Sequence, residues 1–140
     1  MVTKLVIVSD ASSVIAEVRA AIDDGEIEIV ELRSGALVRP LVEADPPDVV
    51  VTDCQVQSMG GIAIAMDLKL EQSGGRIPHV PVLILCDRRA DVFLARRAGA
   101  EGYLVKPLDP IRLRRAVTAL VDGSTFYDES YTPLSIAAAD

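Results

Sequence analysis

Four residues with ligating or reactive side chains each come at the end of an apolar run: Asp10, Asp53, Cys86 and Lys106. The clearest run is Val49–Asp53, which is β-branched and stops at one carboxylate. Two carboxylates and a lysine suit Mg²⁺ with a phosphoryl group, because carboxylate oxygens bind the metal and the lysine pairs with phosphoryl oxygens. An aspartate can also accept the phosphoryl group itself and form an acyl phosphate.

The elements that must position these residues are short strands alternating with helices. Continuous apolar runs are typical of strands buried on both faces, and alternation of apolar residues with acids indicates a half-exposed edge strand. By these criteria the strands are expected at residues 4–9, 27–32, 49–53, 82–85 and 102–105, with 27–32 at an edge. Helices are expected over residues 12–25, 35–44, 62–70, 87–98 and 109–121, the second bent or shortened by Pro40.

This alternation predicts an α/β fold, a doubly wound parallel sheet with helices on both faces. Right-handed crossovers place the carboxyl ends of all its strands at one edge, which is where open α/β sheets bind ligands. The residues that end the apolar runs are therefore expected to meet there.

The spacing of apolar residues also predicts which helix faces are buried. The third predicted helix has a stripe of Ile62, Met66 and Leu70, and the fourth has Val92–Leu94 facing inward with arginines outward. The last helix has a core stripe of Leu113, Val117, Leu120 and Val121. Ser12 or Ser13 is expected to cap the first helix.

Size and composition fit one domain. The 140 residues have a formal net charge of −7, which argues against direct nucleic acid binding, and no apolar run approaches the length of a membrane span. We expect a cytoplasmic protein, in which Cys54 and Cys86 form no disulfide framework and no closed metal site. A domain over residues 1–121 is expected, followed by an acidic extension, 122–140, and no output domain.

Two motifs resemble the response-regulator receiver domain, the CheY-like family. The stretch Gly99–Pro107 is similar to the family's fifth-strand motif, and Val49–Asp53 is followed by Met59 and Gly61 at the family's offsets. The resemblance covers residues 4–121. It implies a flavodoxin-like (βα)5 fold with strand order 2-1-3-4-5.

The resemblance also implies roles for site residues. Asp53 would be the phosphoacceptor, Mg²⁺ would be held by Asp10, Asp53 and the backbone carbonyl of Gln55, and Lys106 would contact the phosphoryl group. The peptide bond before Pro107 would be cis.

Three positions depart from the family pattern. Ser9 stands where the family has a second acid, and Val56–Gln57 replaces Met-Pro. Cys86 stands where the family has the Thr or Ser that binds a phosphoryl oxygen, and a thiol is a weaker donor. Tyr103, at the position of the family's switch aromatic, is either a switch or simple packing.

Three functions remain in contention. The first is a stand-alone, atypical receiver in two-component signalling. It would be phosphorylated by a histidine kinase or phosphotransfer protein, and its fourth helix, fifth strand and fifth helix would contact a partner protein or a second copy. The second is a phosphorylation-independent pseudo-receiver, an interaction or dimerisation module. The third, a flavodoxin-like enzyme or FMN carrier, is disfavoured because no Gly- or Ser/Thr-rich phosphate loop follows the first strand. The arginines of the fourth and fifth helices form either a partner surface or a solvated basic face.

Overall fold

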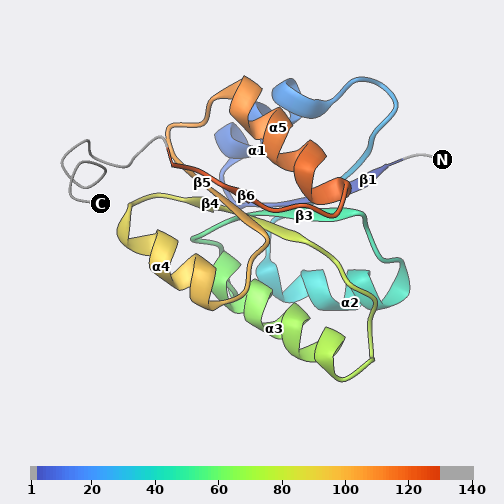
Figure 1. Ribbon diagram of the computed structural model, residues 1–140. Helices are drawn as coiled ribbons and strands as arrows, with labels where there is room; N and C mark the ends of the chain where they lie inside the picture. Colours follow the sequence, from blue (N-terminus) through green and yellow to red (C-terminus); the bar gives the residue numbers. More distant parts are fainter. Residues whose placement is uncertain (1–2, 130–140) are drawn as a thin grey trace.

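The computed structural model describes residues 3–129, and within them the chain forms one parallel sheet covered by helices on both faces (Figure 1). The strands are β1 (Lys4–Val8), β2 (Glu28–Leu32), β3 (Val49–Asp53), β4 (Val82–Cys86), β5 (Gly102–Val105) and β6 (Phe126–Tyr127). The helices are α1 (Ser12–Ile22), a 3₁₀ turn η1 (Gly35–Leu37), α2 (Val38–Ala44), α3 (Gly61–Ser73), α4 (Ala90–Arg97) and α5 (Pro110–Val121).

The strand order is β2-β1-β3-β4-β5-β6, and every neighbouring pair is parallel. The predicted flavodoxin-like order 2-1-3-4-5 is therefore confirmed. Pro40 falls within the first turn of α2, where its missing N–H would have no helical partner in any case, and the 3₁₀ turn precedes it.

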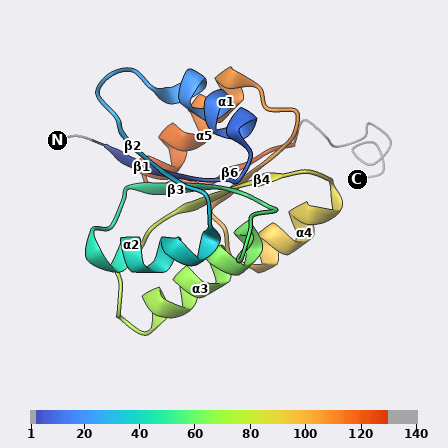
Figure 2. The same ribbon diagram turned by 180° about the vertical axis from the view of Figure 1, so that it is seen from behind.

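The sheet separates two hydrophobic cores. Helices α1 and α5 cover one face, and α2, α3 and α4 cover the other, as Figures 1 and 2 show from opposite sides. Residues Val49, Val50 and Val51 are fully buried because both faces of β3 are covered. This central strand therefore holds Asp53 rigidly at the carboxyl edge of the sheet.

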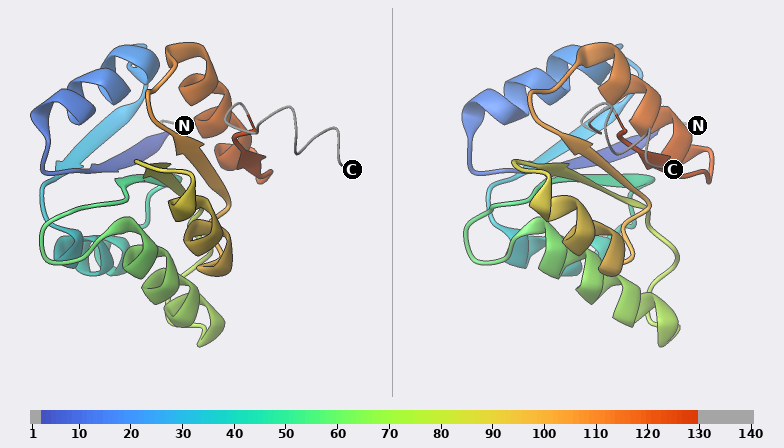
Figure 3. Two further views of the ribbon diagram at one scale, coloured as in Figure 1. Left: turned by 90° about the vertical axis from the view of Figure 1, so that its left-hand side faces the viewer. Right: turned by 60° about the vertical axis from the view of Figure 1, so that its left-hand side comes forward.

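One strand was not predicted. Residues 122–140 were expected to form an extension, but Phe126–Tyr127 forms β6 and pairs with β5 at the edge of the sheet, beside α5 (Figure 3). A two-residue strand has no periodicity to detect, and its position depends on contacts with distant residues. Residues 130–140 of the predicted extension lie outside the described residues.

The predicted inward faces of two helices were partly wrong. In α4 only Val92 of the apolar triplet is buried, whereas Phe93 is 75% exposed and Leu94 is also exposed. In α3, Met66 and Leu70 are exposed too. Successive residues of a helix point about 100° apart, so a helix that rests on a sheet buries one stripe and does not bury three successive residues.

The buried apolar side chains of α3 are instead those of Ile64, Ala65 and Leu68. In α5 the predicted core positions are buried except Val121, which lies at the exposed carboxyl end. Neither Ser12 nor Ser13 caps α1, whose N-cap residue is Ala11 without a side-chain cap.

Candidate functional site

The carboxyl ends of β1, β3, β4 and β5 lie at the same edge of the sheet, as parallel pairing requires. Asp53 ends β3, Cys86 ends β4, and Lys106 directly follows β5. Asp10 lies two residues after β1. The topology thus gathers at one edge the four residues that the sequence singled out.

Asp53 is 4% exposed and both of its carboxylate oxygens have protein partners. Lys106 donates from Nζ to Oδ1 at 2.7 Å, and the hydroxyl of Ser9 donates to Oδ2 at 3.0 Å. The same Ser9 oxygen accepts the backbone N–H of Ala11 at 3.0 Å. Asp53 is therefore a fixed, buried carboxylate beside a positive charge.

Lys106 is shared between two carboxylates, because its Nζ also donates to Asp87 Oδ1 at 2.9 Å. Burial acts to lower the pKa of Lys106, but the hydrogen bonds to Asp53 and Asp87 outweigh burial and raise that pKa above its usual value. Lys106 therefore stays charged at neutral pH.

Asp87 is a site residue that was not predicted from the sequence. The available signal was its place directly after Cys86, at the edge where the other residues meet.

Asp10 lies in the exposed loop after β1 and accepts the backbone N–H of Gln57 at 3.0 Å. This bond ties the loop after β1 to the loop after β3, which also carries Gln55. The oxygens of Asp10 and Asp53 and the carbonyl of Gln55 are hard ligands of the kind that bind Mg²⁺.

Cys54 and Cys86 are buried free thiols. Burial raises the pKa of Cys54 to about 11 and the pKa of Cys86 to about 12, so both are protonated at neutral pH. Within residues 3–129, no group of three or more His, Cys, Asp or Glu side chains is arranged to hold a metal ion. These thiols thus resemble small buried apolar groups more than reactive ones.

Tyr103 is buried in β5 and belongs to the same hydrophobic core as Cys86. Its ring stacks on Tyr127, with the centroids 5.3 Å apart. The peptide bond between Lys106 and Pro107 is cis.

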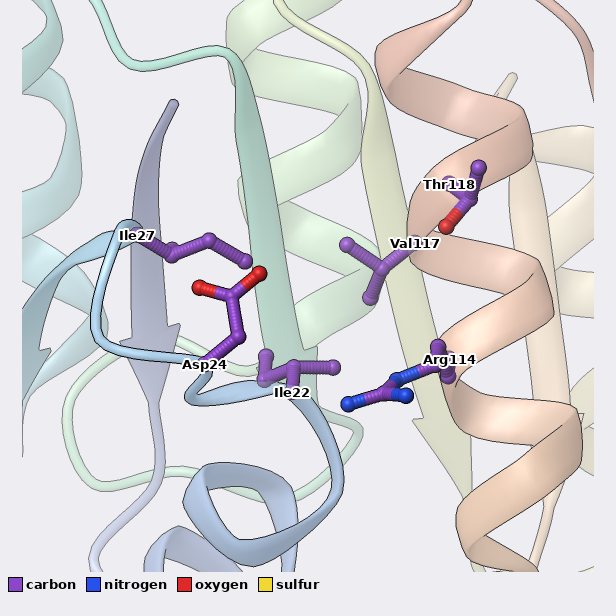
Figure 4. Close-up of a pocket in the computed structure, with 6 residues that line it drawn as sticks. All are labelled: Ile22, Asp24, Ile27, Arg114, Val117 and Thr118. Carbon is purple, nitrogen blue, oxygen red and sulfur yellow. The ribbon is translucent and has the colours of Figure 1, made fainter. Parts of the chain in front are cut away.

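A pocket of about 280 Å³ lies between the end of α1 and α5 (Figure 4). It is lined by Ile22, Asp24, Ile27, Arg114, Val117 and Thr118. The connection from α1 to β2 lies at the amino edge of the sheet, so this pocket is remote from Asp53.

Residues 5–118 match the model of the response regulator receiver domain family. The chain belongs to this family. It is a receiver domain of the two-component response regulator type, a signalling domain, and this membership disfavours the phosphorylation-independent alternative.

Relatives of known function include the nitrate/nitrite response regulator NarP of Escherichia coli. It is 31% identical over 108 residues, which are 77% of this chain and 49% of NarP. The chain thus spans about half the length of NarP. The chemotaxis protein CheY-3 of Vibrio cholerae is 27% identical, with 85% of this chain and 92% of CheY-3 covered.

Solved structures have the same fold. The receiver domain of NarL from Mycobacterium tuberculosis has a TM-score of 0.74 at 26% identity, covering 87% of this chain and 98% of that one. The receiver domain of the sensor histidine kinase PA1611 from Pseudomonas aeruginosa, described with a magnesium ion in its active site cleft, has a TM-score of 0.74 at 18% identity. It covers 87% of this chain and 99% of its own. Within the described residues of this chain, no helix is both long and apolar enough to cross a membrane.

Proposed function

We propose that Asp53 accepts a phosphoryl group from the phosphohistidine of a histidine kinase or phosphotransfer protein. The observation that carries this proposal is the 2.7 Å contact between Lys106 Nζ and Asp53 Oδ1 at the carboxyl edge of a receiver fold. Asp53 is paired with the ammonium group of Lys106. This cation can move onto the phosphoryl oxygens as they arrive and stabilise their negative charge.

In the transfer, a carboxylate oxygen of Asp53 forms a bond to phosphorus while the phosphorus–nitrogen bond of the donor histidine breaks. The donor imidazole leaves with the electron pair of that bond and takes up a proton. The hydroxyl of Ser9, fixed by Ala11, holds the second oxygen of Asp53 and so orients the carboxylate. Lys106 neutralises charge that builds up on the phosphoryl oxygens.

The oxygens near Asp53 fit Mg²⁺, which is usually bound in proteins by one or two carboxylates with water completing its octahedron. Asp10, Asp53 and the carbonyl of Gln55 would hold the ion. When bound, the ion supplies positive charge that lowers the repulsion between the carboxylate and the phosphoryl group. Ser9 provides a neutral hydroxyl where a carboxylate would add a negative charge, so we expect a lower affinity for Mg²⁺ than with an acid at this position.

The proposal is tested by the intact mass of the chain after incubation with Mg²⁺ and acetyl phosphate. We expect a gain of one phosphoryl group, which is lost without Mg²⁺ and lost in Asp53→Asn. Asp24→Asn, an exposed acid at the opposite edge of the sheet, is the matched control and keeps the gain. A gain that persists in Asp53→Asn would contradict the proposal. Absence of any gain would favour the phosphorylation-independent interaction module.

A further inference from the structure

The segment Phe126–Asp128, called the docking segment below, pairs with the exposed edge of β5. Phe126 donates its backbone N–H to the carbonyl of Glu101 at 3.0 Å, and Asp128 donates its own to the carbonyl of Tyr103 at 3.1 Å. The approach is close, because a Cβ at Gly102 would come within 2.9 Å of the Phe126 oxygen. An edge strand that would otherwise offer unpaired backbone groups is therefore covered by the chain itself.

Asp128 fixes the end of this segment. It is 2% exposed, and its carboxylate accepts the backbone N–H of Val105 at 3.0 Å and Nη1 of Arg112 at 2.7 Å. Buried carboxylates are stable only when paired and hydrogen-bonded, and here the donors come from β5 and α5. These bonds make the docking specific to an acid at position 128.

Tyr127 occupies the surface between β5 and α4. Its ring stacks on Tyr103 with an interplanar angle of 29°, and the guanidinium carbon of Arg96 lies 4.7 Å from its centroid. Three successive residues thus engage α4, β5 and α5. Arg96 and Arg112, both on the predicted basic surface, contact this chain's own segment.

The docking segment and the proposed phosphorylation site are connected through β5. Val105, whose N–H binds Asp128, is followed directly by Lys106, whose ammonium binds Asp53. A phosphoryl group on Asp53 adds negative charge and gives Lys106 new oxygens to pair with. Because Val105 and Lys106 are consecutive residues, a shift of the Lys106 backbone that accompanies this re-pairing would move the N–H that Asp128 accepts.

We propose that the docking segment is an intramolecular ligand of the face formed by α4, β5 and α5, and that its departure and the phosphorylation of Asp53 favour each other. This inference rests on the proposed function. Docking holds Tyr103 buried in the unmodified chain. Position 86 has no hydroxyl, and the thiol of Cys86 is only a weak donor to a phosphoryl oxygen. The position of Tyr103 is therefore set mainly by the docking segment, whose Tyr127 stacks on it.

The same contacts define the partner that the vacated face fits. The backbone edge of β5 can pair with an extended strand, Tyr103 and Arg96 can contact an aromatic ring, and Val105 N–H and Arg112 can donate hydrogen bonds to a carboxylate. The partner is therefore a protein segment in which an aromatic residue is followed directly by an acidic one, in the manner of Tyr127 and Asp128.

The first experiment is hydrogen–deuterium exchange of the full chain with Mg²⁺, with and without beryllofluoride as a phosphoryl mimic. We expect backbone exchange of residues 124–128 to become roughly tenfold faster when beryllofluoride is bound, within the usual range of coupling between two sites. The amino-edge residues of β1 and β3 serve as an internal reference and keep their exchange rates. Unchanged exchange at 124–128 under saturating beryllofluoride would overturn the coupling.

Reciprocity gives the second experiment. Asp128→Asn weakens the docking of the segment. The variant chain should therefore bind beryllofluoride roughly tenfold more tightly than the unsubstituted chain, because coupling acts equally in both directions. Asp122→Asn removes the same charge from an exposed residue near the end of α5 and should leave the affinity unchanged. Equal affinities of Asp128→Asn and the unsubstituted chain would contradict the coupling while leaving Asp53 as the phosphoacceptor. Failure of the unsubstituted chain to bind beryllofluoride at all would overturn the proposed function, and the coupling with it.

Discussion

At the scale of single residues, Lys106 contacts a second carboxylate, Asp87, in addition to Asp53. Asp87 lies 2.9 Å from the ammonium and competes with Asp53 for it. In the unmodified chain this sharing stabilises the charged lysine. Once Asp53 is phosphorylated, Asp87 both competes with the phosphoryl oxygens for Lys106 and places a negative charge near them.

Asp87→Asn should therefore lengthen the lifetime of the phosphorylated chain. Asp87 is 40% exposed, so solvent limits the effect to about 1 kcal/mol, or about fivefold in lifetime. The measurement is the decay of the phosphorylated intact mass after removal of acetyl phosphate, with Asp24→Asn as the control of equal charge. A shorter lifetime in Asp87→Asn would show that Asp87 protects the phosphoryl group instead of repelling it.

At the scale of elements, α4 shows how local pattern and tertiary packing can disagree. Its apolar triplet predicted three buried residues, but the helix rests on the sheet through Val92 and Ala95. Phe93 points away from the core and is 75% exposed. A sequence shows that a residue is apolar, but only the position of the sheet decides which side of a short helix is covered.

Substitutions in α4 test this orientation. Val92→Ala should lower the free energy of unfolding by about 1–3 kcal/mol, because it leaves a cavity beneath the helix. Phe93→Ala should change it by about 0.5 kcal/mol or less, because the ring is mostly in solvent. Urea unfolding of the two variants provides the comparison. A loss of about 3–5 kcal/mol in Phe93→Ala would mean that Phe93 is a core residue after all.

At the scale of the whole molecule, the sequence predicted what depends on apolar runs and missed what depends on distant contacts. Strands β1, β3, β4 and β5 were predicted because buried parallel strands are continuous apolar runs, and β2 because its apolar residues alternate with acids; their common carboxyl edge follows from topology. The second partner of Lys106 and the sixth strand were missed. Asp87 and Asp128 lie in short polar segments whose contacts exist only once the fold brings them against Lys106 and Val105.

The buried thiols and Lys106 give the folded chain a defined dependence on alkaline pH. Burial raises the pKa values of Cys54 and Cys86 to about 11 and about 12, from an ordinary value of 9.0. Above pH 9.0 the unfolded chain loses thiol protons that the folded chain keeps. The stability these thiols contribute is therefore complete below pH 9 and is lost as the pH rises through their folded pKa values.

Lys106 acts with the same sign, because its pKa is raised and its contribution is lost above its ordinary value of 10.5. Urea unfolding at about pH 8 and about pH 10 should show a fall of about 1 kcal/mol per thiol. The double variant Cys54→Ala and Cys86→Ala should lose most of that fall. Stability that rises over this interval would contradict the burial of the two thiols.

The central claim is that Asp53 carries the phosphoryl group, and the most direct measurement locates the group on the chain. After incubation with Mg²⁺ and acetyl phosphate, borohydride reduction converts an aspartyl phosphate to homoserine, which peptide sequencing by mass spectrometry then places. We predict homoserine at position 53, and only when both donor and metal are present. Homoserine at Asp10 or Asp87, in a chain whose position 53 is unmodified, would contradict it.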